Sequence, residues 1–155
     1  MNLLAKDKML EDSPFKNIIL PIDIYDKHCV QAVLPVALNY VSGFESKLHF
    51  LYVIPDFGMK MIEDYLPKHW IKDQKDKYEE QLKSLITKYI PNEISVSTHV
   101  SRGAIYDRVI NFANENKADL IIISAVRPQI RDYMLGSNAS KIVRHAGVSV
   151  LVVRK

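Results

Sequence analysis

Apolar residues fall along the chain in two patterns. Compact apolar runs bounded by polar residues predict strands, whereas apolar residues that recur every three or four positions predict helices. Five strands are predicted, at Lys16–Asp23, Lys47–Ile54, Ile94–Val100, Asp119–Ile123 and Val148–Val153. Four helices are predicted, from Asp26 to Gly43, from His69 to Tyr89, from Gly103 to Ala113 and from about Ser137 to Ala146. The segment 56–67 fits neither pattern clearly.

The order of these elements predicts the fold class. Strands that alternate with helices form βαβ units, so we expect an α/β fold with helices on both faces of a five-stranded, mainly parallel sheet. A chain of 155 residues, 48% of them apolar, suits a single domain with one full core. Ligands of such sheets bind beyond the carboxyl ends of the strands, where the strand order reverses. This rule points to segments 23–26, 53–57, 101–104 and 124–137.

Charge and hydropathy exclude several classes of function. The 21 basic and 18 acidic residues are dispersed along the chain, which argues against nucleic-acid binding. The longest apolar runs, such as Leu120–Ile123 and Val150–Val153, fall far short of the ~20 residues that cross a bilayer. The N-terminal segment also lacks the apolar centre of a signal peptide. We therefore expect a soluble cytoplasmic protein without a membrane partner, with an N-terminal extension at 1–14 and one domain at 15–155.

Cysteine and histidine give no sign of a metal site. The lone Cys29 excludes an internal disulfide framework, and we expect it to be a small buried hydrophobe on a helix. The five histidines lack metal-ligand spacing and are interpreted as surface, helix-end or sheet residues. They are His28, His49, His69, His99 and His145. The sequence therefore predicts neither a metal ligand nor a catalytic residue.

Several short motifs, in order along the chain, carry a resemblance. They are Ile19–Asp23, Leu51–Ile54, Leu135–Ser137 and the terminal Arg144–Val153. From Phe15 onward the chain resembles the universal stress proteins of the UspA superfamily, and Arg127-Pro128 followed by Tyr133–Ala139 is most similar to the F and G branch. Residues 15–155 would then form a universal stress protein domain.

The resemblance implies a fold and a ligand. The family fold is a Rossmann-like, five-stranded parallel sheet of the adenine nucleotide alpha hydrolase type, and many members bind ATP with it. The implied cofactor is ATP or another adenine nucleotide, with or without magnesium. Asp23 matches the carboxylate beside the adenosine moiety, and Val53 matches the strand-end residue whose backbone reads adenine. The strand-end neighbours Pro21, Ile22 and Ile123 belong to the same implied site.

The phosphate motif of the ATP-binding relatives is only half retained. That motif has two glycines separated by two residues, then nine residues, then Gly-Ser or Gly-Thr. Ser124 and Arg127 stand at the two glycine positions, and eight residues rather than nine precede Gly136 and Ser137. Glycine lets a backbone approach phosphate closely, whereas arginine offers a planar fork of donors. We therefore expect Arg127 or Arg131 to replace part of the glycine cradle.

The start of the last helix completes the implied site. Its N-terminus offers unpaired N–H groups to an anion, with Ser137 and Asn138 beside them. Other interpretations stay open. Gly136-Ser137 is also typical of a turn with a helix N-cap, and Arg127 and Arg131 could be solvated loop charges. Asp23 could be a capping carboxylate, although Asp26 is better placed as the cap.

Two functions remain in competition. The first is an ATP-binding regulator or sensor of the stress response that acts through a homodimer. The second is an interaction module for an unknown protein partner, which retains the fold but binds no nucleotide. A redox or flavin protein ranks far behind both. Asp132 is the single candidate carboxylate in the loop, so whether the protein is an enzyme stays open, with at most slow ATP hydrolysis.

The last strand predicts the dimer interface. Val148–Val153 is an apolar strand at the chain end, and an exposed strand edge of this kind promotes aggregation unless it is covered. Pairing with the same strand of a second copy would cover it by two-fold symmetry. The resemblance implies the same homodimer.

Overall fold

The computed structural model describes residues 15–42, 46–56, 65, 67–125 and 135–154. The strands are β1 (Asn17–Pro21), β2 (Lys47–Pro55), β3 (Val96–Gly103), β4 (Leu120–Ser124) and β5 (Ser149–Val153). The helices are α2 (Lys27–Ser42), α4 (Lys68–Tyr89), α5 (Ile105–Glu115) and α6 (Ser137–His145). The order of elements predicted from the sequence is confirmed, with shifts of a few residues at their ends.

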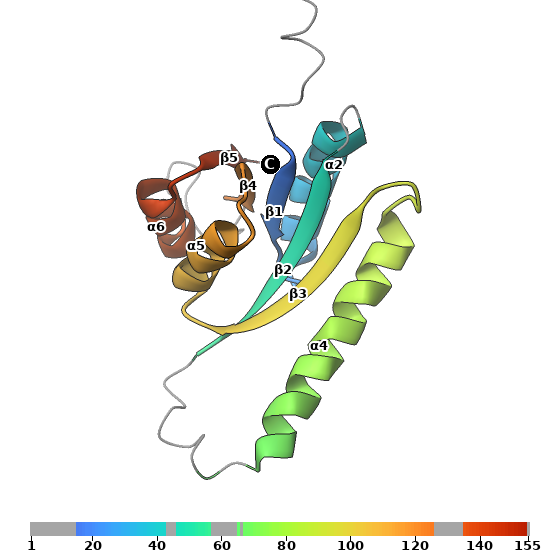
Figure 1. Cartoon of the computed structure of the whole chain (residues 1–155), viewed down its shortest axis with the longest axis vertical. Helices are drawn as coiled ribbons and strands as arrows, with labels where there is room; N and C mark the ends of the chain where they lie inside the picture. Colours follow the sequence, from blue (N-terminus) through green and yellow to red (C-terminus); the bar gives the residue numbers. More distant parts are fainter. Residues whose placement is uncertain (1–14, 43–45, 57–64, 66, 126–134, 155) are drawn as a thin grey trace, which may run out of the picture.

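The five strands form one parallel sheet with the order β3-β2-β1-β4-β5. Helices α2 and α4 cover one face of this sheet, and helices α5 and α6 cover the other (Figure 1). The predicted α/β class, with helices on both faces, is confirmed. Because every connection crosses over a face of the sheet, all five carboxyl ends lie at the same edge.

The core consists of two apolar layers that share the central strands. Ile18 and Leu20 of β1 pack against α2 and α4, while Ile19 packs against α5 and α6. All three side chains are fully buried. A strand covered on both faces has no polar side, which explains why β1 and β4 appear in the sequence as uninterrupted apolar runs.

Strand β3 extends to Gly103, three residues beyond the end predicted at Val100. The extension pairs with the end of β2, where Ser101 lies opposite Val53 and Gly103 opposite Pro55. Since β3 is an edge strand with one neighbour, polar side chains are tolerated there. The predicted strand was too short because the apolar pattern of β3 ends at Val100, whereas its backbone pairing continues to Gly103.

The predicted helix cap is confirmed. Asp26 Oδ1 accepts hydrogen bonds from the backbone N–H groups of His28 at 3.0 Å and Cys29 at 3.1 Å, which satisfies two donors at the start of α2. This cap fixes where the chain leaves the carboxyl end of β1 and turns into the helix.

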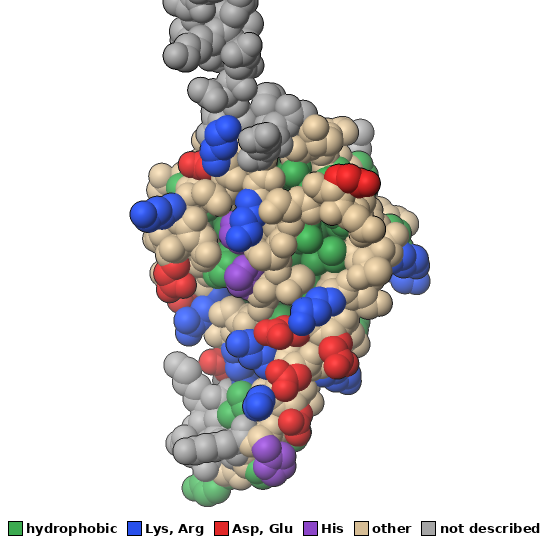
Figure 2. Space-filling view, turned by 45° about the vertical axis from the view of Figure 1, so that its right-hand side comes forward, with side chains coloured by type: hydrophobic (Ala, Val, Ile, Leu, Met, Phe, Trp, Pro, Cys, Tyr) green, Lys and Arg blue, Asp and Glu red, His purple; other side chains and the backbone are tan. Residues whose placement is uncertain are grey.

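Helix α4 is the longest described helix and is largely polar. It packs through Leu82, which is fully buried, and through the half-buried Tyr78, Leu85 and Ile86. Basic and acidic side chains are interspersed along its outer side (Figure 2). Within the described ranges, none of the helices combines the length and apolar character that crossing a membrane requires.

Candidate functional site

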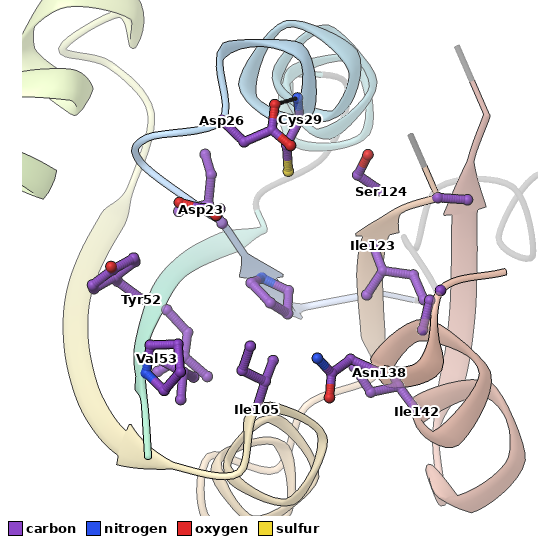
Figure 3. A pocket seen from close by; sticks show the side chains of 17 residues that line it. Asp23, Asp26, Cys29, Tyr52, Val53, Ile105, Ile123, Ser124, Asn138 and Ile142 are labelled. Carbon is purple, nitrogen blue, oxygen red and sulfur yellow. Dashed lines mark hydrogen bonds between the residues drawn. The ribbon is translucent and has the colours of Figure 1, made fainter. Parts of the chain in front are cut away.

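The strand order reverses between β1 and β4. Strands β2 and β3 lie on one side of β1, and β4 and β5 lie on the other. Strands β1 and β4 pair at only two positions, Ile18 with Leu120 and Ile19 with Ile121. Beyond them the strands part, and a cavity of about 430 Å³ opens at their carboxyl ends (Figure 3). This main cavity lies where parallel sheets bind ligands, and its volume suits a small molecule.

The structure brings most of the predicted nucleotide-binding residues together around the main cavity. Those that line it are Pro21, Ile22, Asp23, Val53, Ile123, Ser124, Gly136 and Asn138. Ser137 is exposed and does not line the cavity. Arg127, Arg131 and Asp132 lie outside the described residues. The part that arginine plays in the phosphate loop stays a prediction.

Two carboxylates stand at one end of the main cavity, both on residues 22–26, the β1–α2 segment (Figure 3). Asp23 Oδ1 accepts the backbone N–H of Tyr25 at 3.0 Å, and Asp26 Oδ1 caps α2. Asp23 thus has the capping contact that the sequence left open as an alternative. This bond occupies one oxygen of the carboxylate, which leaves its other oxygen for a ligand hydroxyl group.

The N-terminus of α6 stands at the other end of the cavity. Gly136 is the N-cap residue, and no described side chain caps this helix. The Gly136 carbonyl accepts the N–H of Ser140 at 2.9 Å, so the N–H groups of the first turn have no intrahelical partner. Asn138 turns its side-chain amide into the cavity, near Ile105 and Ile142 (Figure 3). Free N–H groups and the helix dipole together favour an anion.

Cys29 differs from the buried hydrophobe that the sequence predicts. It lies on the first turn of α2, is half-buried, and turns its sulfur into the main cavity (Figure 3). Burial raises the pKa of its thiol, although hydrogen bonds with the Asp23 backbone and the Ser124 side chain oppose that effect. The thiol therefore stays protonated at neutral pH and forms part of the wall. Its place in the first turn of the helix that follows the first strand was the signal available in the sequence.

Sequence reasoning named none of the residues of the apolar walls individually, although Pro55 and Ala125 fall in the strand-end segments to which it pointed. These walls come from β2, the residue after β4 and the helices α5 and α6, namely Leu51, Tyr52, Pro55, Ile105, Ala125, Ala139 and Ile142. Burial raises the pKa of Tyr52 to about 12, with further contributions from Tyr78, Asp23 and Tyr25, so its hydroxyl stays neutral. The apolar stripes of α5 and α6 predicted core contacts for such residues, and only the assembled sheet shows which of them face a cavity.

A second polar cluster, the histidine cluster, lies outside the main cavity and joins three strands. Ser97 Oγ lies 2.8 Å from His49 Nδ1 and 3.0 Å from His99 Nε2, and His49 Nε2 lies 3.5 Å from Asn17 Oδ1. A serine beside a histidine resembles a nucleophile with its base. However, Phe112 packs on both rings, with centroids 6.1 Å from His49 and 4.5 Å from His99. None of these residues lines the main cavity, so we interpret the cluster as structural.

Comparison with known proteins identifies the family. A sequence model of the Universal stress protein family matches residues 14–154. The chain belongs to the universal stress protein family. Within the described part of this universal stress protein, no group of three or more histidine, cysteine, aspartate or glutamate side chains is placed to hold a metal ion.

The relatives of this universal stress protein support the F and G branch of the UspA superfamily. Universal stress protein G of Escherichia coli O157:H7 is 28% identical over 142 residues, covering 90% of this chain and 99% of the relative. Among solved structures, the hypothetical protein MJ0577 superposes with a TM-score of 0.70 at 18% identity, covering 92% of this chain and 98% of the other. The shared fold is thus that of the universal stress proteins.

Two further structures of the family contain adenine nucleotides. The universal stress protein of Archaeoglobus fulgidus, in complex with dAMP, has a TM-score of 0.61 at 19% identity, covering 91% of this chain and 99% of the other. A universal stress protein in complex with cAMP has a TM-score of 0.58 at 19% identity, covering 92% and 98%. At this identity, the likeness shows the fold alone.

Proposed function

We propose that this universal stress protein binds an adenine nucleotide and acts as a regulator or sensor in the stress response. The observation that carries the proposal is the main cavity at the strand reversal, with carboxylates at one end and an uncapped helix N-terminus at the other. A nucleotide has the matching polarity, because its sugar bears hydroxyl groups and its phosphate is an anion. The dAMP and cAMP complexes of family members support this choice of ligand.

The proposed pose follows from the chemistry of the two ends. Asp23 accepts hydrogen bonds from the sugar hydroxyls, and the backbone at Val53 reads the adenine edge, as in the family. Ile105, Ile123 and Ile142 supply apolar surface between the ends. The first turn of α6, with the Asn138 amide, receives phosphate. Such a site is mostly apolar with a few placed polar groups, as is usual for small-molecule pockets.

The proposal is binding rather than efficient hydrolysis. Among the described residues of the main cavity, the only carboxylates are Asp23 and Asp26, and both belong to the β1–α2 segment. Phosphoryl transfer depends on charge stabilisation around the phosphates, at the other end of the proposed pose. Magnesium, if it accompanies the nucleotide, would bind through the phosphates and lower the repulsion among their charges.

Asp23→Ala is expected to weaken nucleotide binding by about ten- to hundredfold, because a hydrogen bond to a carboxylate contributes about 1.5–3 kcal/mol. Heat extraction of one sample shows whether the purified protein carries a nucleotide. ATP, AMP and cAMP are then titrated by calorimetry into a second, nucleotide-free sample. The matched control is Asp73→Ala, which removes an exposed carboxylate from α4. If the wild-type protein binds none of the three at millimolar concentration, the proposed function is wrong. If it binds but Asp23→Ala does not change the affinity, only the role of Asp23 is wrong.

An alternative function is that of an interaction module without a nucleotide. The observation that favours it is Ser124, which lines the main cavity where ATP-binding relatives have glycine. A serine side chain adds bulk and restricts the backbone conformations available for close approach to phosphate. The titrations above separate the two functions.

We further propose that the protein dimerises through β5. This strand lies at the end of the sheet, and its apolar residues Val150, Leu151 and Val152 are only half-buried. The nearby Val143 of α6 is 44% exposed. A second copy of β5 would pair its open backbone groups and cover this apolar surface by two-fold symmetry.

Val150→Lys is expected to convert the dimer to a monomer, because charged side chains on an edge strand oppose pairing. Light scattering at micromolar concentrations should give twice the chain mass for the wild type and the mass of a single chain for the variant. Circular dichroism checks that the variant is folded. Asn111→Lys on the exposed side of α5 is the control and should stay dimeric. A monomeric wild type would contradict the proposed dimer.

A further inference from the structure

Tyr25 occupies the centre of the β1–α2 segment and connects it to α4. Its backbone N–H donates to Asp23 Oδ1 at 3.0 Å, and its hydroxyl donates to Gln81 Oε1 at 2.7 Å. Its side chain is 60% exposed, so packing in the core does not explain its position. One residue thus holds the carboxylate of the main cavity at one end and a surface helix at the other.

The ring of Tyr25 belongs to a cluster of three tyrosines. It contacts the rings of Tyr52 and Tyr78 edge-on, with distances between ring centroids of 6.4 Å and 6.2 Å. The ring centroids of Tyr52 and Tyr78 lie 4.9 Å apart. Tyr52 precedes Val53 at the end of β2, and Tyr78 belongs to α4. Edge-to-face contacts fix the orientation of aromatic rings. The cluster therefore restricts the direction in which Tyr25, and with it the Asp23 carboxylate, can move.

The β1–α2 segment is also held by core packing, since Ile22 is buried and Ile24 packs against the same core, and by two backbone hydrogen bonds. Ile22 N–H donates to the carbonyl of Leu51 at 2.9 Å, and Asp26 N–H donates to the carbonyl of Asp23 at 3.1 Å. The Asp26 cap then begins α2. The first bond holds the start of the segment and the cap holds its end, whereas the Tyr25 side chain supplies the contacts of the segment with Gln81 and Tyr78 of α4. Without them, we expect the Asp23 carboxylate to sample several positions.

Tyr25 also faces a second cavity, of about 260 Å³, between the segment and α4. Gln81 and the half-exposed Tyr89 line this second cavity as well. The same side chain thus contributes to the support of the main cavity and to the shape of the surface beside α4. A ligand that orders Asp23 would order Tyr25 too, and the coupling between two such sites is reciprocal.

We propose that Tyr25 is a positioning residue that holds Asp23 for the ligand and transmits occupancy of the main cavity to the surface formed with Gln81 and Tyr89. The inference rests on the proposed function, because the ligand is the adenine nucleotide argued above. The nucleotide-bound and nucleotide-free proteins would then differ in how strongly Tyr25 orders α4 around Gln81.

The test begins with nucleotide affinity. Tyr25→Ala should raise the Kd for AMP by about tenfold, and Tyr25→Phe, which keeps the ring but loses the bond to Gln81, by about threefold. Tyr65→Ala removes an exposed tyrosine that lines neither cavity, and should leave the Kd unchanged. Melting temperatures of the unliganded variants should stay close to that of the wild type. An unchanged Kd for Tyr25→Ala overturns the proposal.

A double-mutant cycle distinguishes positioning from a general effect. In the Asp23→Ala background, Tyr25→Ala should have little further effect on the Kd, because the group that it positions is absent. A full additional tenfold loss would overturn the proposal. Hydrogen exchange of α4 around Gln81 should slow when AMP binds the wild-type protein, and equal exchange with and without AMP would overturn transmission to α4.

A ligand-free measurement separates this inference from the proposed function. Cys29 is the only cysteine of the chain and lines the main cavity next to the segment. Without nucleotide, Tyr25→Ala should increase the rate of Cys29 alkylation by iodoacetamide by about threefold or more, because local opening exposes the thiol. Equal rates overturn positioning by Tyr25. Faster alkylation in a protein that binds no nucleotide supports positioning and shows that the proposed function has failed instead.

Discussion

Gly103→Ala is expected to lower the free energy of unfolding by about 1–3 kcal/mol, which is the cost of holding a non-glycine residue in an unfavourable backbone region. The φ angle of Gly103 is +138°, a conformation that L side chains rarely adopt. A Cβ atom there would lie 2.7 Å from Arg108 Nε, but this exposed side chain can move aside, so the backbone conformation carries most of the cost. Chemical denaturation of both proteins measures the difference.

Gly147→Ala provides a matched control. Gly147 has no positive φ angle, and a Cβ atom added there would meet nothing within 4 Å. Its effect should stay within about 0.5 kcal/mol, as is usual for surface substitutions. Equal stability changes at the two glycines would contradict the strain at Gly103.

The Gly103 carbonyl also accepts the Asp56 N–H at 3.4 Å, and Gly103 leads into α5. Nucleotide affinity should therefore fall with Gly103→Ala, as the rim of the main cavity shifts.

The protein is expected to lose about 2 kcal/mol of stability between pH 7.5 and pH 5.0 through His49. Burial lowers the pKa of His49 from 6.5 to about 4, with further contributions from Lys47 and His99. The unfolded chain therefore binds more protons than the folded chain between these two values. The contribution is fully present above pH 6.5 and is lost as the pH falls toward 4. Thermal melts across this range measure it.

Most charged neighbours of the histidine cluster act in the same direction, and one opposes it. Burial also lowers the pKa of His99, and Lys47 and Lys75 add to the effect, whereas Glu79 on α4 opposes it. Asp119, which precedes β4, accepts the backbone N–H groups of Lys16 and Asn17 at the start of β1 with its carboxylate, at 2.8 Å. The side chain that α5 packs on both rings is the uncharged Phe112.

His49→Gln separates the titration of the cluster from its packing. The variant should be less stable than the wild type at pH 7.5, because a buried ring and its hydrogen bonds are lost, but its stability should fall less on acidification. His69→Gln on the exposed side of α4 should follow the wild-type curve. The same slope in His49→Gln and in the wild type would show that other groups cause the acid sensitivity.

The fold could be predicted from the sequence because its signals are local. Strands β1 and β4 are buried on both faces, so their apolar runs are continuous, and Asp26 was identifiable as a cap from its position before an apolar stripe. The end of β3 was missed because Ser101, Arg102 and Gly103 pair through the backbone, and side-chain patterns do not report backbone pairing. The exact ends of elements thus depended on neighbours that a linear pattern does not contain.

The site could be predicted only in part, because side-chain direction depends on the assembled elements. The strand-end rule and the resemblance led to Asp23 and Val53, which line the main cavity. They did not separate Ser137, which is exposed, from Asn138, which turns inward, because one step along a helix rotates a side chain by about 100°. Cys29 was likewise predicted to be a buried hydrophobe, although the first turn of α2 places it in the wall of the main cavity.

The short pairing of β1 with β4 has a mechanical consequence. It joins two blocks of the sheet through two paired positions, whereas β2 and β3 share eight. Tension across the sheet would therefore separate β1 from β4 most easily. A molecule in the main cavity would touch both blocks and act as a cross-link between them. The separation of β1 from β4 makes room for a ligand. A bound ligand would then increase the force needed to pull the two blocks of the sheet apart.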